Sequence, residues 1–575
     1  MKKYKKNLMY VIIIIICLIL SGCGISGDSS IVEDIDIKSY KDFFEDNSSI
    51  TIYYFDIDNL SENDVIERTY QSDSTNNVGS CESYIIKSGN IEILVDAGYQ
   101  TFNSSFSIKE EYPYTFSHQY LKQNVQKNIM RKVASVCTDG VLEYLVVTHS
   151  DFDHIASLCV DGGIFDSFYN EEIITNLRGQ DIKLKSINNI IDFNSGVLSL
   201  HSYEKIYKDQ RLCRALYQTY LVKIDKLINK NNNSSNYLPA ASLFSEKIVA
   251  NDGTTMSLKN KLLATPDKMK EHVEKYFQSR ILTENQPNDA ASQYVNDIKK
   301  NSDYKDSVER LGGELISESE RYYYKINLNS NVEFRILYNW YYDFAYRQSF
   351  DDGNRGQPIN NPSVCFEVVS GKFKFLSCGD IGGNGENGLI NYYENTSILK
   401  SVTLYKASHH GSTTNEENSE RIFNTITPKI IVVTGCAQSP LDVKNTTAAY
   451  MKQKFFDNIY NGLHDAQGVL NNNLLEEPYI LCTNINWFRI NESNNIPLNE
   501  SKPFYGDIKI SYSKGKTYIS YSYRGIIHAL VHTGSQEDVV DFRTVKEGKI
   551  VKIQDTEWFR KVGFKYGEIE NGGDN

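Results

Sequence analysis

Four side chains of types that commonly bind metal ions lie within six residues of one another: His149, Asp151, Asp153 and His154. They follow the apolar run 141–147, whose β-branched and aliphatic residues predict a buried strand. Two carboxylates and two imidazoles are costly to bury this close together without cations, because like charges repel and each group needs a partner. A polar loop with a helix cap would explain one aspartate but not the whole set. The sequence therefore predicts a metal site at the end of this strand.

The same arrangement, a strand that ends in an acidic residue or a histidine, recurs elsewhere in the chain. Asp96, Asp380 and the pair His409 and His410 each follow a predicted strand. Ligands that arrive from several strand ends at one edge of a sheet can build a two-metal site from distant parts of the sequence. Together these positions supply the ligands that the first cluster lacks.

The elements that must position these side chains are mostly strands. One predicted helix precedes the strand 141–147 and another follows it. The expected helices cover 119–136 and begin again at 154–158. The expected strands are 49–55, 83–87, 91–95, 141–147, 322–327, 332–338, 363–369, 372–376, 402–406, 429–435, 508–512 and 517–523.

Between residues 160 and 330 the pattern changes to that of a largely helical insertion. Apolar residues recur at helical spacing from Leu212 to Leu227, and a polar break follows at 231–236. The other faces of this helix are basic, which is typical of a solvated surface but is also expected of a lid that presents cations to an anionic substrate. The basic residues are Lys208, Arg211, Arg214, Lys223 and Lys226.

The motif His149-x-Asp151-x-Asp153-His154 resembles the HxHxDH metal signature of the metallo-β-lactamase-fold superfamily, with Asp in place of the second His. That replacement is similar to ComEC-like competence metallo-hydrolase domains and to choline-binding phosphorylcholine esterases. Other segments that resemble the ComEC-like domain occur in the expected order: Phe55-Asp56-Ile57, 79–83, 361–363, 378–381 and 406–412.

The resemblance implies an α/β fold, a metallo-β-lactamase-like αββα sandwich with a large, mostly helical insertion. The expected organisation is a lipoprotein signal peptide at 1–22, a tether at 23–48, the two halves of the sandwich domain at 49–159 and 331–525, the insertion at 160–330 and a C-terminal extension at 526–575.

The resemblance also implies roles for the site residues. His149 and Asp151 would hold one metal ion, and Asp153, His154 and His410 would hold a second, with Asp380 bridging both; His409 would sit beside the substrate and Asp96 would orient a ligand histidine. Which of His409 and His410 binds metal stays open. Two divalent ions are expected, and the ligand set suits zinc and also manganese. Asp153 or Asp380 could accept the proton of the attacking water.

Two departures from the family pattern narrow the expected chemistry. Around residues 338–340 there is no counterpart of the separate histidine of the lactamases, which weakens the first metal site and a β-lactam-hydrolysing role. The late His-Pro motif of ComEC-like domains is replaced around 438–441, which leaves its contribution to substrate positioning in question.

The first residues predict export and a lipid anchor. A basic start precedes the apolar run 8–20, and Leu20-Ser21-Gly22-Cys23 resembles a bacterial lipobox, which implies a lipid on Cys23 and a place on the outer face of the cell membrane. An ordinary signal peptide or an uncleaved anchor is the alternative. Loss of residues 1–22 would change the net charge from −12 to −16. So acidic a chain disfavours indiscriminate binding to nucleic acid, whose affinity comes largely from Lys and Arg.

The ten cysteines are scattered and form no CxxC pair, which argues against a zinc ribbon. Most are expected to be small buried residues, and the sequence alone pairs none of them as disulfides.

These observations predict a surface-anchored dinuclear hydrolase, a phosphodiesterase that acts on an anionic, phosphate-containing substrate through metal-activated water. Within enzymes, the alternatives are a competence-related nuclease and a lactonase or other esterase. From a different class, the alternative is a substrate-binding lipoprotein with a degenerate, non-catalytic site.

Overall fold

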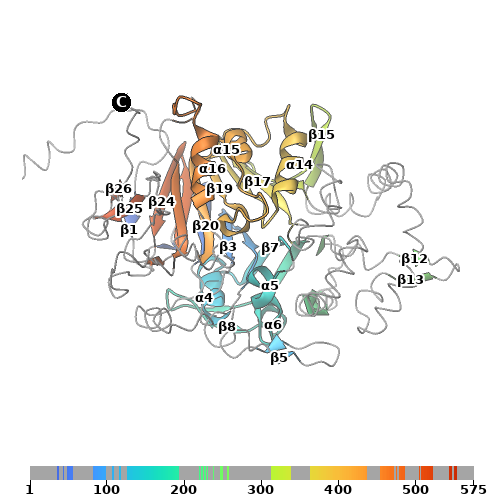
Figure 1. The fold of residues 1–575 in the computed structure, drawn as a ribbon. Helices are drawn as coiled ribbons and strands as arrows, with labels where there is room; N and C mark the ends of the chain where they lie inside the picture. The colour runs from blue at the N-terminus through green and yellow to red at the C-terminus, as the bar shows by residue number, and fades with distance from the viewer. Residues whose placement is uncertain are drawn as a thin grey trace, which may run out of the picture.

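The computed structural model describes most of the residues that the sequence assigns to the sheets. It covers 43–44, 48–55, 82–98, 126–149, 151–192, 313–338, 363–436, 453–471, 478–485 and 507–521, with shorter pieces at 35–37, 107–108, 116–117, parts of 219–230, 237–238, 247–249, 255–257, 360, 474, 504–505, 543–546 and 549–552. The fold of these residues is mixed α/β, with two nine-stranded sheets (Figure 1). The predicted lipidation site, Cys23, lies outside them.

The first sheet has the order β1-β24-β23-β2-β3-β4-β7-β10-β11. From β23 to β4 neighbouring strands are antiparallel, whereas β4, β7 and β10 run parallel. The strands are β1 Ile35–Ile37, β2 Ile50–Tyr54, β3 Tyr84–Ser88, β4 Ile91–Val95, β7 Val141–Val147, β10 Ser186–Asp192, β11 Tyr237–Leu238, β23 Ile508–Ser513 and β24 Lys516–Tyr521.

The strands of the second sheet lie in sequence order, from β14 to β22. It is antiparallel from β14 to β18 and parallel from β18 to β21. The strands are β14 Gly313–Glu318, β15 Arg321–Asn329, β16 Val332–Tyr338, β17 Cys365–Ser370, β18 Phe373–Ser377, β19 Leu404–Lys406, β20 Ile430–Cys436, β21 Tyr479–Ile485 and β22 Phe504–Tyr505. Two-stranded ribbons pair β5 Ser107–Ile108 with β6 Phe116–Ser117, β8 Ile173–Thr175 with β9 Asp181–Lys183, β12 Lys247–Val249 with β13 Thr255–Ser257, and β25 Arg543–Lys546 with β26 Lys549–Lys552.

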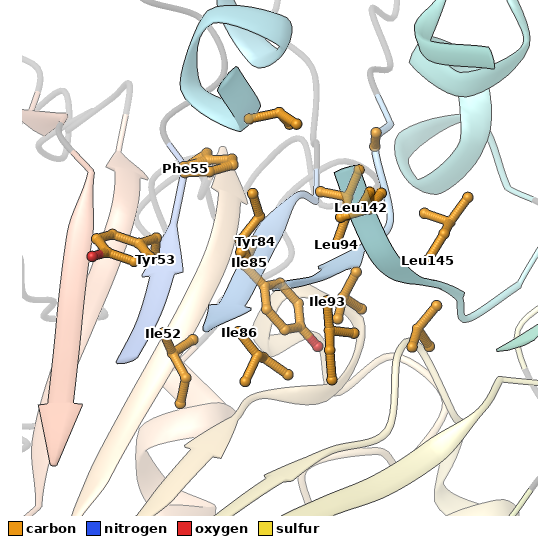
Figure 2. Close-up of a cluster of buried hydrophobic side chains, with 14 of the residues drawn as sticks. Ile52, Tyr53, Phe55, Tyr84, Ile85, Ile86, Ile93, Leu94, Leu142 and Leu145 are labelled. Carbon is orange, nitrogen blue, oxygen red and sulfur yellow. The ribbon is translucent and has the colours of Figure 1, made fainter. Parts of the chain in front are cut away.

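The inner faces of the two large sheets share one hydrophobic core. The Phe375 ring lies 6.2 Å from that of Tyr54 and 6.0 Å from that of Tyr84, and so joins β18 to β2 and β3. Successive residues of a strand point to opposite faces, so Ile86 points toward the second sheet and Leu94 of the neighbouring strand points away from it (Figure 2). The sheets are therefore packed against each other through alternate apolar residues.

Helices cover the outer faces of both sheets. In the second sheet Leu404 belongs to the core between the sheets, whereas the next residue, Tyr405, packs beneath the helices. In Figure 1 α14, α15 and α16 lie on one side of the molecule, and α4, α5 and α6 on the other. The helices are α4 Gln126–Val136, α5 Phe152–Cys159, α6 Ile164–Tyr169, α14 Gly383–Tyr393, α15 Glu420–Ile426 and α16 Gln453–Leu463.

The helix that overlaps the predicted metal-binding motif 149–154 begins at Phe152, two residues earlier than the predicted start at His154. The reason is local, because the Asp151 side chain accepts a hydrogen bond from the Phe152 N–H and so caps the helix. Of the predicted helix 119–136, residues 126–136 form α4, and the predicted start at 119–125 lies outside the described residues.

The sheets extend into the region predicted as the insertion. β10 pairs with β7 in the first sheet, and β14 and β15 join the second sheet through β16. The described residues of 219–230 are helical, and Tyr220, Ile224 and Leu227 pack into the core, as their spacing predicts. Lys223, predicted on the basic face, is buried instead, and its ammonium pairs with Asp166 at 2.5 Å. Lys223 therefore does not present its charge to a substrate.

Within the described residues, no helix combines the length and apolar character that a membrane span requires.

Candidate metal centre

The candidate residues meet where strands of both sheets end. In the first sheet these are the ends of the parallel neighbours β4 and β7. In the second sheet they are the ends of the parallel neighbours β18 and β19. A backbone hydrogen bond of 3.0 Å from Val364 N to Thr148 O joins the two sheets at this place. Because all four strands deliver the residues that follow them to this place, side chains hundreds of positions apart in the sequence lie together.

Asp380 lies at the centre of the cluster. Its Oδ2 atom is 3.1 Å from His154 Nε2, 3.5 Å from His410 Nε2 and 3.8 Å from His149 Nε2. Asp153 Oδ2 lies 3.2 Å from His410 Nε2. All five side chains are buried. Three imidazole nitrogens and two carboxylates therefore converge on one small volume.

The charge state and hydrogen bonds of His149 indicate whether this volume fits a metal ion. Burial and the neighbouring His154 hold the pKa of His149 well below its usual value, so its ring is neutral. Thr148 Oγ1 lies 3.1 Å from its Nδ1, whereas its buried Nε2 makes no hydrogen bond within the described part of the chain. A neutral imidazole with a buried nitrogen aimed at carboxylates is the form in which histidine binds a metal ion, so the residues fit such an ion.

Asp96 orients His154 by binding Nδ1, the ring nitrogen that does not face Asp380. Its Oδ2 accepts hydrogen bonds from His154 Nδ1 at 2.7 Å and from Thr148 Oγ1 at 2.5 Å, and its Oδ1 accepts one from Thr148 N at 2.8 Å. When the ring is neutral, as a metal ligand must be, a proton held on Nδ1 leaves the Nε2 lone pair of His154 directed at Asp380. Gly98 lets the Asp96 turn approach closely, since a Cβ there would lie 1.7 Å from the Asp153 carbonyl carbon.

The same carboxylates control the charge of His154. Burial opposes its protonation, but Asp380 and Asp96 raise the pKa of His154 well above the usual value. Burial likewise disfavours a charged Asp380, but His154 and His410 hold the pKa of Asp380 well below its usual range. The site is thus arranged to keep its central carboxylate ionised, the state that attracts a divalent cation.

His410 and His409 lie in a strained turn. Both have a left-handed backbone, with φ of 52° and 47°, which is unusual for residues with a side chain. Asn418 braces the turn, because its amide donates to the carbonyls of Ser408 and Ser412, each at 2.7 Å. The turn lies in the short 3-10 helix η5 Ser408–Gly411.

The two histidines differ in their partners. His410 Nδ1 lies 2.9 Å from the Thr434 carbonyl, which directs its Nε2 into the cluster. His409 Nδ1 lies 2.8 Å from Glu417 Oε1, and the His409 side chain keeps 14% exposure. Burial opposes its protonation, but the bond to Glu417 and the charge of Asp380 raise the pKa of His409 to about 9. His410 therefore has the position of a ligand, and His409 that of a partly accessible cation beside it.

Glu82 also joins the cluster, although the sequence did not single it out as a ligand. One ligand atom each of Glu82, His154, Asp380 and His410 lies within 4.8 Å of the others, a group that could hold a metal ion. The available signal was its place in segment 79–83, which carries part of the family resemblance.

Lys406 is a second residue that sequence reasoning did not place at the site. This buried ammonium forms an ion pair with Glu82 and lies 3.4 Å from Asp380 Oδ1. Burial alone would lower the pKa of Lys406, but Glu82 and Asp380 raise it. The charge of Glu82 is thus neutralised by the Lys406 ammonium. Asp380 differs, because its Oδ2 atom faces the histidines instead.

Asp151 has a described role in addition to the predicted one of metal ligand. Its Oδ1 accepts a hydrogen bond of 3.3 Å from Phe152 N as the cap of α5, and its side chain is only partly buried. The four-residue group around Glu82 does not include it.

Comparison of the chain with protein-family models and with curated proteins finds no match. The geometry of the site therefore carries the functional argument.

Proposed function

We propose that this protein is a lipid-anchored, extracytoplasmic, dinuclear metal-dependent hydrolase that cleaves a phosphodiester. The observation that carries the proposal is the convergence of His149, His154 and His410 on the ionised, buried Asp380. A purely structural cluster would satisfy its buried nitrogens by hydrogen bonds, whereas Nε2 of His149 has none among the described residues.

The arrangement of elements supports a metallo-β-lactamase-like αββα sandwich for the fold. Two sheets share an inner core, helices cover both outer faces, and the candidate ligands follow strands of both sheets. This layer order agrees with the resemblance carried by the motif from His149 to His154 and by the segments around Asp380 and His410.

The ligand set consists of His149, Asp153, His154, Asp380 and His410, with Asp151 as a further predicted ligand. Mixed imidazole and carboxylate donors suit zinc and also manganese. Glu82 would act as the counter-ion of Lys406 rather than as a metal ligand, because the two side chains form a buried ion pair.

When bound, two divalent ions would lower the pKa of a water molecule and offset the negative charge that develops on phosphorus. Asp153 or Asp380 would accept the proton that this water loses, because both carboxylates are held at the site in a form that can take one. His409, a partly accessible cation fixed by Glu417, would donate a hydrogen bond to a phosphoryl oxygen. Asp96 would keep His154 in the ligating tautomer.

A phosphodiester is the substrate class that best matches a site with an adjacent imidazolium. The net charge of −12 for the whole chain disfavours a general nucleic-acid substrate. The predicted lipid anchor would hold the site beside anionic wall polymers, so we propose a teichoic acid or its phosphorylcholine groups as the substrate.

The test is hydrolysis of a bis-nitrophenyl phosphate ester by the purified protein with zinc or manganese. Asp380→Ala should abolish turnover, whereas Asp139→Ala, at an exposed turn before the opposite end of β7 from the cluster, should retain it. Teichoic acid and single-stranded DNA, compared as substrates, distinguish the polymer hydrolase from a nuclease. Preference for a lactone or carboxylic ester would favour the esterase alternative. A wild-type protein that binds no metal and turns over no substrate would overturn the proposal in favour of a binding protein.

A further inference from the structure

Two cysteines lie opposite each other at the end of the hairpin that carries Asp380. The ladder between β17 and β18 pairs Phe366 with Ser377, so the next residues outward, Cys365 and Cys378, face each other across the strands. The match continues two residues further out, since Asp380 N donates a hydrogen bond of 3.1 Å to Ser363 Oγ.

Both cysteine side chains also point to the same face of the second sheet. They belong to the apolar cluster beneath the helices, with Leu376 and Tyr405. Cys365 Sγ lies 4.0 Å from the Cys378 carbonyl oxygen. Both are buried and reduced in this structure. Register, face and contact therefore all bring the two sulfur atoms together.

We propose that Cys365 and Cys378 are a redox modification site and form a cross-strand disulfide beside the metal centre. Directly opposed residues of an antiparallel pair lie about 4.5–5.5 Å apart at Cα, within the range of about 4.4–6.8 Å that disulfides span. The bond would fasten β17 to the turn that holds Asp380, two residues after Cys378. This inference does not depend on the proposed hydrolase activity.

The reaction requires an oxidant, and a small-molecule disulfide is the class that fits. One protein thiolate attacks the external disulfide and releases one thiol, and the second protein thiolate attacks the resulting mixed disulfide and releases another. Two protein thiols and one external disulfide thus give one protein disulfide and two external thiols. Burial raises the pKa of Cys365 and shields both sulfur atoms, so the exchange is fastest while the chain folds.

The experiment is to refold the whole protein with oxidised and reduced glutathione, block remaining thiols, and digest it with trypsin without reduction. Lys372 and Lys374 lie between the two cysteines, so trypsin separates peptide 356–372 from peptide 375–400 unless a disulfide joins them. We expect a linked species two hydrogen masses below the sum of the two peptides, which disappears on reduction. The melting temperature of this form should exceed that of the reduced protein by about 3 °C.

Cys137→Ser is the matched control, because Cys137 is another buried free cysteine but lies at the end of α4 in the other half of the molecule. It should leave the linked species intact, whereas Cys365→Ser and Cys378→Ser should each remove it. Because a variant can fail to fold, the decisive sample is the wild type. If folded wild-type protein shows peptides 356–372 and 375–400 unlinked, or shows Cys365 joined to another cysteine, the inference is wrong.

Discussion

Replacement of Asp96 by Asn tests how the protein holds His154 in its ligating form. The two side chains have nearly the same shape, so the change alters hydrogen bonding and charge with little effect on packing. Asp96 accepts from three donors, of which Thr148 N and His154 Nδ1 lie against different oxygens. The amide of an asparagine has only one oxygen, so one of those two donors must face an N–H group.

The backbone N–H of Thr148 cannot be removed, but the proton of His154 can change nitrogen. If it moves to Nε2, the lone pair that faces Asp380 is lost. If it stays, two N–H groups oppose each other in a buried site. Loss of such a supporting partner lowers metal affinity by about 10- to 100-fold. That range equals about 1.4–2.7 kcal/mol of binding free energy.

The assay is competition between the protein and a chelator for zinc, followed at equilibrium and constant pH. Asp139→Asn is the control, because Asp139 lies at an exposed turn where an amide oxygen can still accept from Val141 N. Asp96→Asn should bind zinc more weakly than this control while keeping a native circular dichroism spectrum. Equal affinities for Asp96→Asn and the wild type would refute the orienting role of Asp96.

Three further substitutions test other parts of the structure. Burial raises the pKa of Glu386 to about 8 from its usual 4.5, so its contribution to stability is full below pH 4.5 and is lost as the pH rises toward 8. Glu386→Gln should therefore remove about 2–3 kcal/mol of the pH dependence of unfolding between pH 5 and 7, measured by urea titration, and an unchanged dependence would contradict this origin. Asn418→Ala removes the side chain that donates hydrogen bonds to the carbonyls of Ser408 and Ser412. It should lower the free energy of unfolding by about 3 kcal/mol and weaken zinc binding. Zinc binding at wild-type strength would show that the turn does not need Asn418. Gly98→Ala places a methyl group against the Asp153 backbone and should reduce the yield of folded protein or its thermal stability, whereas a variant with wild-type stability would show that this close approach is not required.

Local patterns in the sequence were sufficient for much of the sheet structure. The runs at 91–95, 141–147 and 332–338 coincide with β4, β7 and β16, because alternation and continuous apolar runs reflect the faces that a strand buries. The borders of the insertion differ, since β10, β14 and β15 join the large sheets from inside region 160–330. β15 coincides with the predicted strand 322–327, whereas β10 is stabilised by pairing with β7, a contact that local composition does not reveal.

The sequence by itself singled out the candidate ligands: His149, Asp153, His154, Asp380 and His410 stand out because histidines and carboxylates follow strands. Only the tertiary structure decided how they are used, because distances between residues from two sheets depend on how those sheets pack. It places Asp96 behind His154, gives His409 and His410 different partners, and gives Asp151 the role of a helix cap. It also brings the buried ion pair of Lys406 and Glu82 to the site, a contact between residues more than three hundred positions apart that no local pattern encodes.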